Sequence, residues 1–168
     1  MMQAVGVVLL AFGGAYMGFH AAGELSRRAV IQGRTAASLA LLEQELELGG
    51  YELKDCFRTL ADRGGGEEKK FFSACAAGME KLETEPFPCL WSRLAGELPI
   101  GTEGQRVLAA LGETLGRCEV SRQRQALRLA AEALTRLSEQ TREQYRRQGK
   151  VFQAVGVSAG AFLAILLL

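Results

Sequence analysis

The chain has 168 residues, with 20 basic and 19 acidic side chains that leave a net charge of +1. This balance excludes a general electrostatic attraction of the whole chain to nucleic acid. All of the charged side chains lie between Glu24 and Lys150. The sequence therefore divides into an apolar segment at 1–23, a charged domain at 24–150 and a second apolar segment at 151–168.

Both apolar segments meet the length of a transmembrane helix, which is about 20 mostly apolar residues with about 17 as a lower limit. Each also holds a G-x-x-x-G pattern, at Gly14 and Gly18 in the first and at Gly156 and Gly160 in the second. Small residues four apart let helix backbones approach closely in a membrane. We therefore predict two spans whose glycines pack on each other or on partner spans. The alternative is that glycine is simply common in membrane helices.

Basic residues flank the charged side of both segments, which favours a cytoplasmic position for the domain between them. They are Arg27, Arg28 and Arg34 after the first segment, and Arg142, Arg146, Arg147 and Lys150 before the second. We expect a cell-membrane protein with two spans and a cytoplasmic central domain. The alternative is a removed leader and a single C-terminal anchor, which would place the domain outside. The first segment lacks the positive start of a secretory signal.

The first helix is expected to continue from the apolar segment into the charged domain and to end near Gly49 and Gly50. Apolar or small side chains recur along it at helical spacing, which predicts one buried face. They are Ile31, Thr35, Leu39, Leu42 and Leu46.

Four short helices are predicted next, separated by glycine and proline. They are marked by Leu53–Leu60, by Phe71–Leu82 before Pro86, by Leu90–Leu98 before Pro99, and by a stretch from Thr102 to near Gly116. Gly64–Gly66 forms a flexible turn. Thr102 and Gln105 have the spacing of a capping box.

A last helix is predicted from Glu119 to the C-terminus, because nothing there breaks it. One face holds Leu127, Ala130, Leu134, Leu137, Thr141 and Tyr145. No strand is predicted. The fold class is all-α: a cytoplasmic bundle of about six helices whose first and last members continue into two transmembrane segments.

Motifs of catalysis are not found. The sequence has no phosphate-binding loop, dinucleotide fingerprint or zinc-protease pattern, and the single histidine, His20, lies at the edge of the first span. The four cysteines form no C-x-x-C pair and are interpreted as reduced core residues. We predict no enzyme, no cofactor and no metal site.

The corner between the fifth and last helices is rich in exposed-type polar residues and is the predicted partner-binding site. The candidates are Glu113, Thr114, Arg122, Gln123 and Arg124. The basic run from Arg117 to Arg128 has three interpretations: a solvated face, a docking face for an acidic protein, or a nucleic-acid site. Interspersed glutamates and the absence of aromatics argue against nucleic acid as a partner.

Two stretches resemble the stage III sporulation protein AB family. Leu41-Leu-Glu-Gln-Glu-Leu46, followed by Gly50-Tyr-Glu-Leu53, is similar to that family's first cytoplasmic helix. Leu111-Gly-Glu-Thr-Leu-Gly116, followed by Gln123, is similar to its C-terminal half. The resemblance covers nearly the whole chain, including both apolar segments.

The resemblance implies a membrane protein of endospore-forming bacteria, in an assembly across the membranes between mother cell and forespore during engulfment. It implies a cytoplasmic domain on the mother-cell side, similar to the six-helix F-type platform proteins of type II secretion. The implied partners are other membrane proteins of the complex and a cytoplasmic AAA-type or secretion-type ATPase, by resemblance stage III sporulation protein AA. The first hypothesis is thus a non-enzymatic platform. The alternative is a membrane adaptor unrelated to sporulation that self-associates through its last helix.

Overall fold

A computed structural model describes residues 2–48, 52–81 and 85–167, with side chains described within 23–47, 52–80 and 85–147. The chain divides into two compact units. One consists of Met1–Arg27 with Gln140–Leu168, and the other of Arg28–Glu139. The second unit holds nearly all of the described core.

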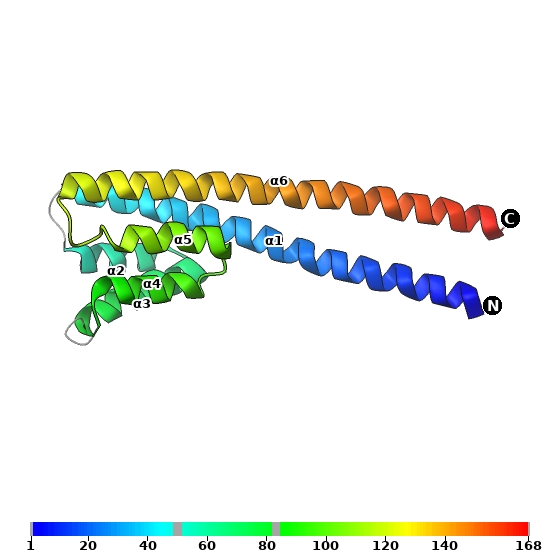
Figure 1. Ribbon diagram of the computed structural model, residues 1–168, viewed down its shortest axis with the longest axis horizontal. Helices are drawn as coiled ribbons and strands as arrows, with labels where there is room; N and C mark the ends of the chain where they lie inside the picture. The colour runs from blue at the N-terminus through cyan, green and yellow to red at the C-terminus, as the bar shows by residue number, and fades with distance from the viewer. Residues whose placement is uncertain (1, 49–51, 82–84, 168) are drawn as a thin grey trace. The chain divides into compact units, whose positions relative to one another are not determined.

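Six α-helices and one short 3-10 helix make up the described chain (Figure 1). They are α1 (Met2–Leu48), α2 (Leu53–Arg63), α3 (Glu67–Gly78), η1 (Met79–Lys81), α4 (Phe87–Glu97), α5 (Gly101–Gly112) and α6 (Val120–Leu167). The described residues contain no strand. The predicted all-α class and the number of helices are confirmed.

The two predicted spans lie outside the part of the chain whose side chains are described. Residues 2–22 and 151–167 follow helical backbone within α1 and α6. Within the described residues, none of the helices combines the length and the apolar character that crossing a bilayer requires. The spans, their domain boundaries, and the packing role of Gly14, Gly18, Gly156 and Gly160 therefore stay predictions.

An aromatic core joins the short helices. Trp91 on α4 is fully buried, and its ring centroid lies 5.6 Å from that of Phe57 and 4.9 Å from that of Phe71. Phe72 stacks on Phe57 with ring centroids 6.0 Å apart. The indole N–H of Trp91 donates to the carbonyl oxygen of Leu108 on α5 at 2.6 Å. Burial and a satisfied polar tip together give aromatic side chains a large share of core stability.

The predicted apolar faces of the long helices are confirmed within this unit. Ile31, Thr35, Leu39 and Leu42 of α1 are buried, as are Leu127, Ala130 and Leu134 of α6. Two buried side-chain hydrogen bonds link distant parts of the unit. Gln32 Nε2 donates to the Ile100 carbonyl at 2.7 Å, and Ser138 Oγ donates to the Ala29 carbonyl at 2.8 Å.

Three side chains are less buried than the sequence predicts. Tyr145, expected on the buried face of α6, is 41% exposed. Cys89, expected in the core, is exposed, and Cys118 is half-buried, whereas Cys56 and Cys75 are buried as predicted. A single cysteine adds no periodic pattern, so the sequence does not indicate whether it lies on the buried or the exposed face of its helix.

The predicted capping box at Thr102 is wrong. α5 begins at Gly101 after Ile100, and no side chain caps it. Gly101 has a φ of +80°, a left-handed conformation that glycine adopts easily, and the N-cap is Ile100, two residues before the predicted Thr102. Gln105 instead donates through Nε2 to the carbonyls of Gly96 and Leu98, both at 2.9 Å, and so links α5 to the end of α4.

Candidate partner-binding surface

The corner between α5 and α6 is an ordered turn. The backbone N–H of Arg117 donates to the Thr114 carbonyl at 3.4 Å, and that of Cys118 donates to the same oxygen at 3.2 Å. Gly116 has a φ of +74°, where a side chain would be strained. The corner is thus held by its own backbone, with Glu113 exposed and Thr114 half-buried.

Gln123 holds this corner to the start of α6. Its Oε1 accepts the backbone N–H of Gly116 at 3.1 Å, and its Nε2 donates to the Cys118 carbonyl at 2.6 Å. Both ends of the side-chain amide are therefore in use within the chain. The structure gives Gln123 a positioning role at the predicted site.

The basic side chains near the corner differ in what they contact. Arg124 pairs with Glu47 of α1, its Nη2 lying 2.9 Å from Oε1. Arg117 lies 3.7 Å from Glu113, with both side chains exposed. Exposed pairs of this kind contribute about 0–1 kcal/mol each. They keep the local charge nearly balanced, which favours the solvated-face interpretation for these positions.

Arg122 is the member of the predicted set most available to a partner. Its side chain is exposed. The ion pairs formed by its neighbours do not include it: among the described residues, carboxylates pair with Arg117, Arg124 and Arg128. The structure thus brings Glu113, Thr114 and Gln123 together at one corner, with Arg122 on the adjoining turn of α6.

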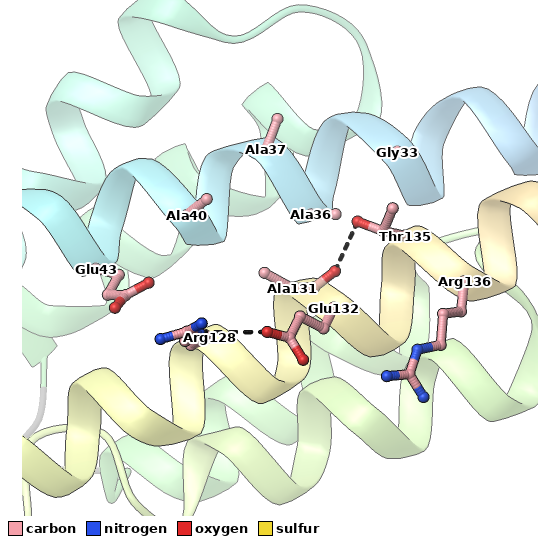
Figure 2. A pocket seen from close by; sticks show the side chains of 10 residues that line it. All are labelled: Gly33, Ala36, Ala37, Ala40, Glu43, Arg128, Ala131, Glu132, Thr135 and Arg136. Atoms are coloured by element: carbon pink, nitrogen blue, oxygen red, sulfur yellow. Dashed lines mark hydrogen bonds and ion pairs between the residues drawn. The ribbon is translucent and has the colours of Figure 1, made fainter.

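A groove of about 510 Å³ runs between α1 and α6 in the same unit (Figure 2). Small side chains form much of its lining. They are Gly33, Ala36, Ala37 and Ala40 on α1 and Ala131 on α6. Charged side chains flank it. Two of them form an ion pair, with Arg128 Nε 3.3 Å from Glu132 Oε1.

Sequence reasoning missed this groove. The signal was present, because Gly33, Ala36, Ala37 and Ala40 follow the spacing of one helix face. A row of small residues does not reveal from sequence whether another helix covers it. None of the predicted partner-binding residues lines the groove.

Among the described residues, burial or a charged neighbour shifts the pKa values of Cys56, Cys75, Glu85 and Arg93. Burial raises the pKa of the Cys75 thiol, and burial, followed by the charges of Glu45 and Asp55, raises that of Cys56. Buried neutral thiols are unreactive. A hydrogen bond from Arg93 at 3.0 Å lowers the pKa of Glu85. Among the described residues, no three potential metal ligands lie together.

These features define an all-α bundle with an ordered polar corner between α5 and α6 and a groove between α1 and α6. The family model of stage III sporulation protein AB matches residues 3–168. The chain therefore belongs to this family, and the resemblance inferred from its motifs is confirmed. The family assigns the chain to sporulation. Neither the curated proteins nor the solved structures include a significant match to it.

Proposed function

We propose that the chain is a platform component of a sporulation membrane complex, in which it docks a cytoplasmic ATPase at the membrane. The observation that carries the proposal is the family match across residues 3–168, which takes in both apolar segments and the charged domain between them. In this proposal the domain faces the mother-cell cytoplasm, and the two apolar segments anchor it.

The helical bundle supports a docking role. Its aromatic core fixes the short helices, so surface side chains are presented on rigid elements. The corner at 113–118 is held by backbone hydrogen bonds and by Gln123, which lowers the conformational entropy lost on binding. Arg122 supplies an exposed positive charge beside it, suited to an acidic patch on the ATPase.

Family membership excludes the alternative that the chain is unrelated to sporulation. The other part of that alternative, self-association through α6, can be distinguished from ATPase docking by experiment. A self-associating chain would co-purify with further copies of itself and without the ATPase.

The test is co-purification of the ATPase with the tagged full chain from membranes, comparing the wild-type chain with Arg122→Glu. We expect the charge reversal to lower the recovered ATPase at least fivefold. Arg136→Glu is the matched control, since Arg136 is also exposed on α6, about 21 Å further along the helix. Equal recovery with all three chains would overturn the assignment of the corner as the docking surface.

A further inference from the structure

The turns of α6 that precede the second apolar segment are strongly basic. Residues 142–150, which we call the basic stretch, hold four basic side chains and one acidic side chain, a net of +3. The basic residues are Arg142, Arg146, Arg147 and Lys150, and the acidic one is Glu143. α6 runs through this stretch without a break and continues to Leu167 (Figure 1).

Helical spacing gathers these charges on one side of α6. Arg142, Arg146 and Lys150 recur every four residues, and residues four apart lie on the same face of a helix. Arg147 lies next to this row, three residues before Lys150. Like charges at such spacing repel one another, so the row is destabilised unless an anion lies nearby.

The chain does not neutralise the described members of this row. Arg142, Arg146 and Arg147 are exposed. None of the ion pairs between described side chains includes any of the three, whereas Arg128, further back on α6, pairs with Glu132. The three guanidinium groups are therefore available to an anion from outside the chain.

Tyr145 adds an aromatic side chain to the basic stretch. It was expected on the buried face of α6, but it is 41% exposed. Tyrosine is enriched where a membrane meets water, because its ring is apolar and its hydroxyl group is polar. An exposed tyrosine next to Arg146 thus fits a position at the level of lipid headgroups.

Distances along the helix bring the basic stretch within reach of those headgroups, given the proposed anchoring by residues 151–168. At 1.5 Å per residue, Arg147 lies about 6 Å and Arg146 about 8 Å before Val151. The attraction of an anionic membrane surface falls off within a Debye length, which is about 8 Å at physiological ionic strength. Arg142 lies about 14 Å before Val151 and reaches this zone only with an extended side chain.

We infer that the basic stretch binds the headgroups of anionic lipids in the membrane that anchors the chain. The inference rests on the proposed anchoring and goes beyond ATPase docking, because it assigns the chain a lipid ligand. A guanidinium group donates two parallel hydrogen bonds to phosphate oxygens, which suits Arg146 and Arg147. The adjoining apolar segment favours a lipid over a soluble phosphate or an acidic protein, because it lies among the acyl chains while the arginines meet the headgroups.

The test offers the full chain two lipids that differ only in their headgroups. The chain in detergent is mixed with equal amounts of dioleoyl phosphatidylglycerol and dioleoyl phosphatidylcholine and is then passed into lipid-free detergent by gel filtration. Mass spectrometry quantifies the lipids that stay bound. Each basic side chain near an anionic surface strengthens the attraction about fivefold. We therefore expect at least threefold more phosphatidylglycerol than phosphatidylcholine, and equal retention of the two lipids, or retention of neither, would overturn the inference.

Two double variants locate the effect on α6. Arg146→Gln with Arg147→Gln removes two charges beside the membrane and should bring the ratio of the two lipids close to one. Arg128→Gln with Arg136→Gln removes two exposed charges at least about 20 Å before Val151, and it should keep the wild-type ratio. An unchanged ratio in the first variant, or an equal loss in both, would contradict the assignment. Because no ATPase is present, the result is independent of the docking experiment.

Discussion

The aromatic core around Trp91 and the Glu68 recess, which lies between α1, α2 and the loop before α3, differ in whether their buried polar atoms have hydrogen-bond partners. In the core, the one polar atom of Trp91 is fully buried and satisfied by Leu108 at 2.6 Å. In the recess, Glu68 is equally hidden but keeps Oε2 without a donor among the described residues. The first arrangement satisfies its buried polar atom within the fold, and the second leaves one buried carboxylate oxygen unsatisfied by the described residues.

Truncating the core should have the largest effect. Trp91→Ala removes a fully buried ring and the hydrogen bond to Leu108, and we expect it to lower the free energy of unfolding by about 3–5 kcal/mol. The measurement is denaturant unfolding of the full chain, followed by circular dichroism. Val120→Ala, at a side chain that is 50% exposed, is the control and should change stability by less than about 0.5 kcal/mol. A loss below about 1 kcal/mol for Trp91→Ala would contradict the packing described.

Two glycines test how tightly the core is packed. A Cβ on Gly112 would clash with Trp91 Cγ at 2.9 Å, and Trp91 is locked by its hydrogen bond. Gly112→Ala should therefore cost about 1–3 kcal/mol. Gly96, inside α4, has nothing within 4 Å of the position that a Cβ would take, so Gly96→Ala should add roughly 0.5–1 kcal/mol through helix propensity. Thermal unfolding of the two variants checks whether each change raises or lowers stability. A Gly112→Ala chain more stable than wild type would show that the side chains around Trp91 can shift to make room for the added methyl group.

The recess should respond differently to a change of its central side chain. Glu68→Gln retains an acceptor for the Gly65 N–H and removes a buried charge whose Oε2 lacks a donor among the described residues. We expect stability to change by less than about 1 kcal/mol, in contrast to the core variants. Denaturant unfolding at neutral pH checks this. A loss of about 3 kcal/mol or more would mean that the carboxylate is fully paired within the chain, as in a buried ion pair.

The smallest effect concerns an exposed pair outside both regions. Arg93 lowers the pKa of Glu85, so this contact contributes stability above the usual carboxyl pKa of about 4.3. The contribution is lost as the pH falls through the lowered pKa. The stability difference between the wild-type chain and Arg93→Gln should thus shrink between about pH 6 and pH 3. A difference that grows on acidification would refute the assignment.

Helical periodicity carried most of the fold prediction. Spacing alone identifies one face of a helix, and the residues that it selects within Ile31–Leu42 and Leu127–Leu134 are buried. Local capping was less predictable: Gln105 has the spacing of a capping box with Thr102, but it bonds carbonyls at the end of α4 instead. The capping-box rule considers only residues within one helical turn, so it does not predict a hydrogen bond to carbonyls of the preceding helix.

The candidate sites depended still more on tertiary contacts. The corner residues could be selected from their polar character, but the role of Gln123 in holding the turn could not. The Glu68 recess requires Arg34, the Gly64–Gly66 loop and Glu68 to meet, and they come from separate helices and a loop. In sequence, the three glycines predicted only a flexible turn.

The most direct test of the central claim is a pull-down of the tagged full chain from membranes of sporulating cells, with mass spectrometry as the readout. The platform account predicts recovery of a cytoplasmic ATPase together with other sporulation membrane proteins, above the level from a matched untagged strain. Recovery of the chain alone, with no ATPase above that background, would contradict it.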